Sequence, residues 1–538
     1  MNNNQSSKPW GPWTSDQGDG YYRNPVLHAD YSDPDIIRVA EDFYLTASSF
    51  GHLPGLPILH SKDLVNWRLI NHAIPSMPLP NYDAPQHGNG VWAPSLRYHE
   101  GKYWIFYGDP DVGIFMTTAD DPAGEWSALH LVQEGKGLID ACPFWDDDGQ
   151  AYLVHAYANS RSGIKHRLRV CRMAPDGTRL LDEGVIIIDD PESQPTIEGP
   201  KMYKRNGYYY IFAPAGGVEE GWQTVLRSPG PLGPYEVRIV MQQGTTPING
   251  PHQGGWVELS SGESWFMHFQ HKDAYGRIVH LQPMVWQDDW PLIGDDIDGD
   301  GIGEPVLKWT KPNVGGECSI EAPAATDEFD GKRLGLQWQW QANPRADWYS
   351  LQERPGYLRL YAQAAASPQS TLFQAPHLLL QKFPAYSFSA TTVLDAGNLE
   401  PGSRAGLLVF GYRYAGLIVR RDEQGDGYWL QIIEGDADGE RIVCQQEFAE
   451  FTGKEVVLRV DVAPEAWCSF GYRIDGTIRN EGTIDGKLES MEHDPFQATV
   501  SKWVGAKVGL FAQAAQGSTG GSADFRRFLV AEGSIPNL

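Results

Sequence analysis

Five stretches in the first half of this chain share one layout, and that repeat constrains the fold more than any other feature. Each opens on a polar or aromatic residue beside Pro or Gly, continues as a short apolar strand, turns, and returns through an aromatic strand. A four-stranded propeller blade takes roughly 40–50 residues, and the lead residues of the copies stand 48–59 residues apart. The repeat therefore predicts a five-bladed β-propeller.

The lead residues are chemically unusual for strand starts. They are Asp33, Trp92, Asp140, Glu198 and His252. Radial stacking brings the start of each innermost strand to a common axis. We therefore expect two Asp, one Glu, one His and one Trp at the mouth of one pocket.

The chain as a whole is predicted to be all-β, with two domains and a linker. Residues 20–308 hold the propeller, and residues 309–325 are a Pro/Gly/Ala-rich linker. Residues 326–535 lose the blade layout but keep about nine candidate strands, one of them Thr371–Leu380, which predicts a jelly-roll-like β-sandwich.

Net charge narrows the class of partner. The formal charge is −26, whereas binding to nucleic acid or an anionic membrane needs a basic surface. A neutral polymer or small molecule fits better, and most of the charge has the simpler role of keeping the surface solvated. The 19 Trp and 24 Tyr pack blades for the most part, although such rings also stack on sugars.

Cysteine usage and the N-terminus predict a cytoplasmic location. The five cysteines show no CxxC or zinc-type spacing, which favours free thiols in a reducing compartment. Residues 1–13 lack a basic segment followed by an apolar one, so no signal peptide is visible. A secreted chain trimmed of its leader would look the same, and that alternative stays open. No apolar run approaches the ~20 residues of a membrane span.

Three carboxylates are candidates for acid–base chemistry. Cleaving a glycosidic bond needs one protonated and one ionised carboxyl group flanking it. Asp33 lies in a Ser-Asp-Pro sequence that is also a plain turn signal, whereas Asp140 lies between apolar neighbours, where an unpaired charge is expensive. The shared blade position of Asp33, Asp140 and Glu198 favours chemistry over turns.

Two sites could hold a metal ion. His252 is either a metal ligand or a hydrogen-bonded structural histidine. Asp296, Asp298 and Asp300 alternate before a glycine as in the first half of a calcium loop, but position twelve should be a bidentate Glu and is Leu307. A polar hairpin explains that loop equally well.

Several motifs together identify a family resemblance. They are NPVLHADYSDPDIIRV, GVWAPSLRYHEGKYWIFYGDP, IDACPFWDDDGQAYLVHA, IEGPKMYKRNGYYYIFAPAGG and DEFDGKRLGLQWQWQANP. They resemble glycoside hydrolase family 43, above all its β-xylosidase and α-L-arabinofuranosidase members with a C-terminal β-sandwich. The resemblance implies a five-bladed propeller and hydrolysis with inversion.

Roles follow from the resemblance position by position. Asp33 matches the general base, Glu198 the general acid, and Asp140 the third carboxylate that orients the acid and adjusts its pKa. A nearby carboxylate does raise the pKa of an acid by like-charge repulsion. The remaining matches are Phe50, Trp92 and Ala93 in the terminal-sugar subsite, Arg277 holding the carboxylates and sugar hydroxyls, and His252 beside a structural, mostly water-coordinated calcium ion.

The leading hypothesis is an exo-acting glycosidase that releases terminal xylose, arabinofuranose or both from xylan-derived oligosaccharides. An arabinofuranosidase or galactan-directed enzyme with little xylosidase activity is the alternative, and Val218 after the AxGG turn, where some xylosidases carry a polar residue, leaves it open. A non-catalytic carbohydrate-binding propeller is more remote, because all three carboxylates are present. The oligomeric state stays open.

Overall fold

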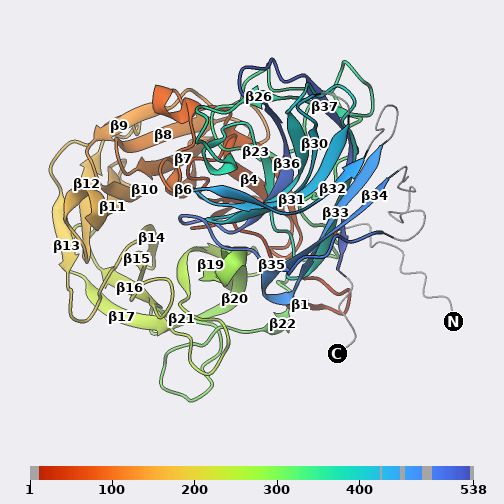
Figure 1. Cartoon of the computed structure of the whole chain (residues 1–538). Coiled ribbons are helices and arrows are strands. Elements are labelled where there is room, and N and C mark those ends of the chain that lie inside the picture. The colour runs from red at the N-terminus through yellow and green to blue at the C-terminus, as the bar shows by residue number, and fades with distance from the viewer. Residues whose placement is uncertain (1–10, 425–426, 449–454, 475–487, 534–538) are drawn as a thin grey trace.

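A computed structural model describes residues 11–424, 427–448, 455–474 and 488–533. A ring of five four-stranded sheets occupies one side of the molecule, and a two-sheet sandwich packs against it (Figure 1). The all-β prediction of a five-bladed propeller followed by a β-sandwich is confirmed. Among the described residues the single α-helix spans four residues, and no helix there is long and apolar enough to cross a membrane.

Each blade is an antiparallel meander whose first strand is innermost and whose last strand is outermost. Blades one and two consist of β2 (Asp35–Val39), β3 (Asp42–Thr46), β4 (Gly55–Ser61), β5 (Trp67–Ile74), β6 (Trp92–His99), β7 (Lys102–Asp109), β8 (Gly113–Ala119) and β9 (His130–Glu134). Blade three consists of β10 (Leu138–Trp145), β11 (Ala151–Tyr157), β12 (Arg167–Met173) and β13 (Val185–Asp189). Blades four and five consist of β14 (Lys201–Arg205), β15 (Tyr208–Ala215), β16 (Trp222–Ser228), β17 (Glu236–Met241), β18 (His252–Glu258), β19 (Ser264–His271), β20 (Arg277–Gln287) and β21 (Trp290–Ile293).

The ring is closed outside the blades. The short strand β1 (Tyr21–Arg23), which precedes blade one, pairs antiparallel with β22 (Lys308–Thr310), which follows blade five. The Asn24 amide strengthens this seam by donating to the carbonyl groups of Leu281 and Val306 at 2.7 and 2.8 Å. β22 also extends two residues past the predicted propeller end.

Aromatic side chains pack between blades, as their number suggested. Tyr210 and Phe212 of blade four meet Phe266 and Trp290 of blade five in one buried cluster. Burying a side chain of this size contributes about 1.5–3 kcal/mol. The blades therefore form a rigid frame that fixes the geometry of the inner strands.

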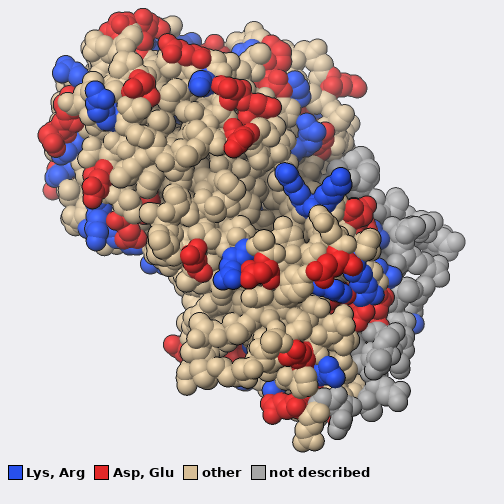
Figure 2. Space-filling view, turned by 90° about the horizontal axis from the view of Figure 1, so that it is seen from above, with Lys and Arg blue, Asp and Glu red and all other residues tan. Residues whose placement is uncertain are grey.

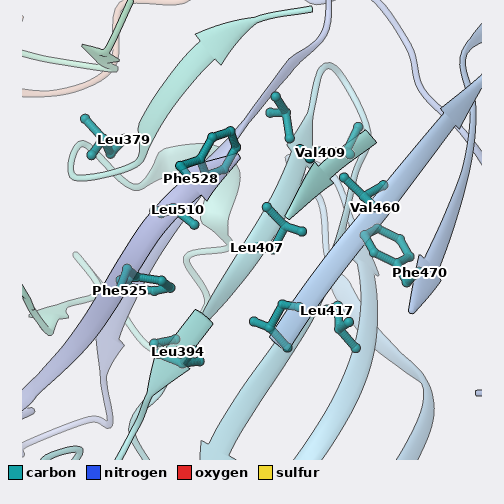
Figure 3. Packing of buried hydrophobic residues seen from close by; sticks show 14 of the residues in the cluster. Leu379, Leu394, Leu407, Val409, Leu417, Val460, Phe470, Leu510, Phe525 and Phe528 are labelled. Atoms are coloured by element: carbon teal, nitrogen blue, oxygen red, sulfur yellow. The ribbon is translucent and has the colours of Figure 1, made fainter. Parts of the chain in front are cut away.

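The sandwich consists of two sheets that face each other across an apolar core. One sheet has the order β23-β27-β36-β29-β30-β31-β32, with β26 beside β36, and the other has the order β24-β25-β37-β28-β33-β34-β35. Their bounds are β23 (Gln339–Trp340), β24 (Tyr349–Ser350), β25 (Leu358–Tyr361), β26 (Gln363–Ala364), β27 (Leu379–Lys382), β28 (Phe388–Asp395), β29 (Arg404–Phe410), β30 (Tyr414–Arg421), β31 (Tyr428–Gly435), β32 (Glu440–Phe448), β33 (Val456–Ala463), β34 (Trp467–Ile474), β35 (Phe496–Gln497), β36 (Lys507–Ala514) and β37 (Ser522–Glu532). Figure 3 shows Leu407 and Leu510 of the first sheet close to Phe525 and Phe528 of the second.

One predicted strand of the sandwich is wrong. Thr371–Leu380 contains a 3-10 helix, η3 (Leu372–Gln374), and the strand begins only at Leu379. The Thr371 hydroxyl caps the helix by accepting from the Phe373 N–H at 3.2 Å. Pro376 explains the interruption, because proline cannot donate to a strand ladder. The predicted end of the domain at residue 535 lies outside the described residues.

The surface carries charges of both signs. Acidic and basic side chains are interspersed over the face shown in Figure 2, with no continuous basic area on that face. The surface in this view offers no obvious platform for a polyanion.

Candidate active site

A pocket of about 400 Å³ opens where the inner strands begin. Its walls are Asp33, Phe50, Trp92, Ala93, Ile139, Asp140, Glu198, Gln253, Arg277 and Trp503. The seven residues predicted for catalysis and substrate binding are all among them. Ile139, Gln253 and Trp503 were missed, and Trp503 belongs to the sandwich.

A common backbone conformation places the side chains at the head of each blade. Five equivalent residues have positive φ: Asp33 (53°), Ala93 (32°), Asp140 (58°), Gly199 (59°) and Gln253 (36°). Left-handed backbone is costly for residues other than glycine, and such strain is typical of functional sites.

This ring corrects the predicted register of the blades. Trp92, Glu198 and His252 were predicted to occupy the same blade position as Asp33 and Asp140, but they precede that position by one residue. The ladder shifts register just there, for example between Trp92 and Ser95. The ladder of blade four begins only at Lys201 and runs without such a shift, and Glu198, just before the left-handed Gly199, still lines the pocket.

Asp33 is almost fully buried and firmly held. One carboxylate oxygen accepts from the hydroxyl groups of Ser32 and Ser48 at 2.7 and 2.6 Å. A guanidinium nitrogen of Arg277 donates to both oxygens, at 2.9 and 3.1 Å. The Ala93 N–H in turn donates to the Ser48 hydroxyl at 2.7 Å, which ties blade two to the carboxylate. The carboxylate therefore has one fixed orientation.

Asp140 and Glu198 form an electrostatically coupled pair. Burial, and next the charge of Glu198, raise the pKa of Asp140 to about 8. The Gly199 N–H opposes this by donating to Asp140 Oδ2 at 2.8 Å. The Glu198 side chain is 24% exposed and lies 2.8 Å from His252 Nε2. The charge of Glu198 therefore bears directly on the protonation of Asp140.

Lys201 is a buried cation that sequence reasoning missed. The residue is fully inaccessible, and its ammonium group donates to the Pro94 carbonyl at 3.2 Å. Its charge acts on Asp140 and lowers the pKa of that carboxyl group. Nothing in the sequence distinguishes Lys201 from an ordinary strand residue.

Trp503 closes the pocket from the sandwich side. It lies in the loop between β35 and β36, has positive φ (69°) and is 44% exposed. Its ring meets that of Trp92 edge to face at 6.0 Å, and the Arg277 guanidinium carbon lies 5.8 Å from its ring centre. The accessory domain thus contributes a wall of the site.

His252 lies behind the pocket and has one nitrogen free for another ligand. Its side chain is fully buried, and its Nδ1 has no hydrogen-bond partner among the described residues. An unpartnered imidazole nitrogen fits either a cation or a water molecule. The Asp296, Asp298 and Asp300 carboxylates lie close together, but all three accept backbone N–H groups of their own hairpin.

Family models match both domains. The model for glycosyl hydrolases family 43 matches residues 22–291, and the model for the beta xylosidase C-terminal concanavalin A-like domain matches residues 326–531. The two matches correspond to the propeller and the sandwich.

Relatives cover nearly the whole chain. A beta-xylosidase of Formosa agariphila is 32% identical over 93% of this chain and 89% of its own length. A non-reducing end alpha-L-arabinofuranosidase of Bacteroides ovatus is 30% identical over 94% of both chains. The crystal structure of a xylan beta-1,4-xylosidase from Bacillus halodurans C-125 superposes with a TM-score of 0.82 and 25% identity, covering 95% of this chain and 100% of that one.

Proposed function

Because this chain belongs to glycosyl hydrolases family 43, we propose that it is an exo-acting glycoside hydrolase that releases terminal xylose, arabinofuranose or both from xylan-derived oligosaccharides. The observation that carries this assignment is the group of three carboxylates and one arginine at the mouth of a small pocket. A pocket walled by Trp92 and Trp503 suits the end of a chain better than its middle. The beta-xylosidase relative supports xylose as the released sugar, and the alpha-L-arabinofuranosidase relative supports arabinofuranose.

The first step is nucleophilic attack by water. Asp33, held by Arg277 and two serine hydroxyl groups, accepts a proton from a water molecule on one face of the sugar. The water oxygen forms a bond to the anomeric carbon while the bond to the leaving oxygen breaks. Attack from the face opposite the leaving group inverts the anomeric configuration.

The second requirement is a protonated acid. Glu198 gives its proton to the leaving oxygen, so the proton of the coupled pair has to reside on Glu198 and not on Asp140. Burial favours the proton on Asp140 instead, but the Gly199 N–H and the Lys201 ammonium both favour ionised Asp140. Ionised Asp140 then keeps Glu198 protonated by charge repulsion.

We further propose one structural calcium ion near His252. The free Nδ1 would supply one ligand, and water would complete the shell, because the described residues place no cluster of acidic or imidazole ligands there. The positive charge would partly offset the three carboxylates. The ion would act structurally and electrostatically, without activating the attacking water.

A reducing, cytoplasmic location is a separate proposal. The five cysteines are all unpaired, and three are buried. Free thiols of this number suit a compartment where disulfides do not form. The substrates would then be imported oligosaccharides.

Two measurements test the reaction. Proton NMR of the first-formed sugar should show the anomeric configuration opposite to that of the substrate, and retention would overturn the assignment. Glu198→Ala should lose most turnover on xylobiose but keep much of it on a dinitrophenyl glycoside, whose leaving group needs no proton. Equal losses on the two substrates would exclude Glu198 as the acid, with Asp33→Ala as the control that loses both.

A further inference from the structure

A buried carboxylate just outside the pocket joins the propeller to the sandwich. Asp30 is 3% exposed. Its Oδ1 accepts from the backbone N–H of Arg277 at 2.8 Å, and its Oδ2 accepts from the backbone N–H of Gly505 at 2.9 Å. One carboxylate therefore holds two segments that lie in different domains.

Both segments carry a residue of the pocket. Arg277 starts β20, and its guanidinium group holds the carboxylate of Asp33. Gly505 follows Trp503 by two residues in the loop that walls the pocket. Asp30 itself does not line the pocket, so any influence on the reaction passes through these two partners.

The two backbones touch beside this carboxylate. A Cβ on Gly276 would lie 2.6 Å from the Gly505 nitrogen, and a Cβ on Gly505 would lie 2.6 Å from the Tyr275 backbone. The next residue, Ala506, donates its N–H to the Ala274 carbonyl at 2.7 Å. The contact is close enough that a displacement on one side moves the other.

Two lysines lie near enough to Asp30 to be influenced by its charge. Lys382 of β27 and Lys507 of β36 are directly opposite each other in the antiparallel ladder, and Lys507 is 2% exposed. Like charges placed opposite each other are destabilising. Burial lowers the pKa of both lysines, and the charge of Asp30 opposes this by favouring their protonated forms. A neutral residue at position 30 would remove this compensation from the buried Lys507 and the half-buried Lys382.

We propose that Asp30 is a positioning residue for the reaction, which fixes the position of the Trp503 loop relative to the Arg277–Asp33 pair. The role rests on the proposed function, in which Asp33 is the base and Trp503 a wall of the sugar pocket. Losing this fixed relative position would displace the base, Asp33, relative to the sugar. Misplacement by about 1 Å costs on the order of 100-fold in rate.

A purely structural role for Asp30 makes a different prediction, and Asn343 provides the matched control. The Asn343 side chain also crosses between the domains, accepting from the Met77 N–H at 2.8 Å and donating to the Met77 carbonyl at 3.0 Å. It lies outside the pocket walls. Asn343→Ala therefore weakens the domain interface without changing the position of the Trp503 loop relative to the Arg277–Asp33 pair.

The test compares Asp30→Asn, Gly505→Ala and Asn343→Ala as full-length proteins, well below their melting temperatures. Asp30→Asn removes the charge and one acceptor, and Gly505→Ala pushes the loop away with the carboxylate intact. Both should lower kcat on an aryl xyloside at least about tenfold and raise KM, whereas Asn343→Ala should leave both within about twofold. Equal effects of Asp30→Asn and Asn343→Ala, or a loss of stability alone, would overturn the proposal.

Hydrogen exchange separates this inference from the proposed function, because it needs no turnover. Asp30→Asn should accelerate exchange in residues 499–506 and in residues 277–281 together, and Asn343→Ala in neither. If exchange rises as expected while the wild-type protein cleaves no pentoside, the proposed function fails, but the link that Asp30 makes between the two segments stands. If exchange at either segment is unchanged, Asp30 does not hold it and the inference fails.

Discussion

Replacing Asp140 by Asn should make the protein more stable at alkaline pH while making it a poorer enzyme. Asp140 is 2% exposed, and its pKa is raised from 3.8 to about 8. A carboxyl group with a raised pKa in the folded state binds its proton more tightly than the unfolded chain does. The folded protein is therefore progressively destabilised as the pH rises from about 4 to about 8.

The size of the effect follows from that shift. One pKa unit corresponds to 1.36 kcal/mol, so a shift of about four units sets an upper bound of roughly 6 kcal/mol. Because the charge of Glu198 contributes to that shift, we expect roughly half of the bound, about 2–3 kcal/mol, for Asp140 by itself. Asn keeps an oxygen that can accept the Gly199 N–H, so the variant removes the charge and preserves that hydrogen bond.

Melting curves of both proteins between pH 5 and pH 9 test this reasoning. At about 2 °C per kcal/mol, the melting temperature of Asp140→Asn should rise by roughly 4–6 °C relative to wild type across that range, and level off above pH 8. Turnover should fall at every pH, because Glu198 loses the neighbour that keeps it protonated. A difference in melting temperature that is independent of pH, or that shrinks as pH rises, would refute the buried-charge argument.

Three further outcomes are expected. A chain ending near Ala325 loses the Trp503 wall and should be insoluble or have sharply reduced turnover; a soluble truncation with full activity on a disaccharide would contradict this. Exhaustive chelation should remove one calcium and lower both activity and melting temperature; metal-free protein unchanged in both would return His252 to the role of a hydrogen-bonded structural residue. Lys507→Met should stabilise the protein most at pH 6. Burial and then the charge of Lys382 lower the pKa of Lys507 from 10.5 to about 7. The charged lysine therefore destabilises the fold fully below pH 7, and this destabilisation fades as the pH rises toward 10.5. A gain of the same size at pH 6 and pH 10, by urea denaturation, would exclude a buried charged lysine.

The blade architecture could be predicted because it repeats in the sequence. The spacing of the copies and the turn after each first strand can be read directly from the sequence. So can the place of Asp33 at a blade start and that of Asp140 between apolar neighbours. The one-residue offset of Glu198 could not be seen in this way. It depends on left-handed backbone at the next residue of the blade, which is Gly199 in blade four but Ala93 and Gln253 in blades two and five, and neither alanine nor glutamine signals such a conformation in a sequence.

The family resemblance suggests that the sandwich packs on the propeller and can wall off the pocket, but the sequence did not reveal which residues make that contact. In the sequence, Trp503 is one of many aromatic residues in a strand-rich region, and Asp30 lies in a polar segment and does not stand out. Their importance comes from tertiary packing between residues that lie far apart in the chain, for which hydrophobic periodicity carries no signal. Pro376 did carry a signal, since proline interrupts strands, and the erroneous strand over Thr371–Leu380 ignored it.

The seam between β1 and β22 also imposes an order of events on synthesis. All five blades leave the ribosome before Lys308–Thr310, so the ring stays open through the whole of their translation. A chain released before that point has β1 without its partner strand, and an unpaired strand edge invites association with other chains. Chains released before residue 310 should therefore aggregate more readily than the chain ending near Ala325, and ribosome-release experiments at successive lengths would reveal the difference.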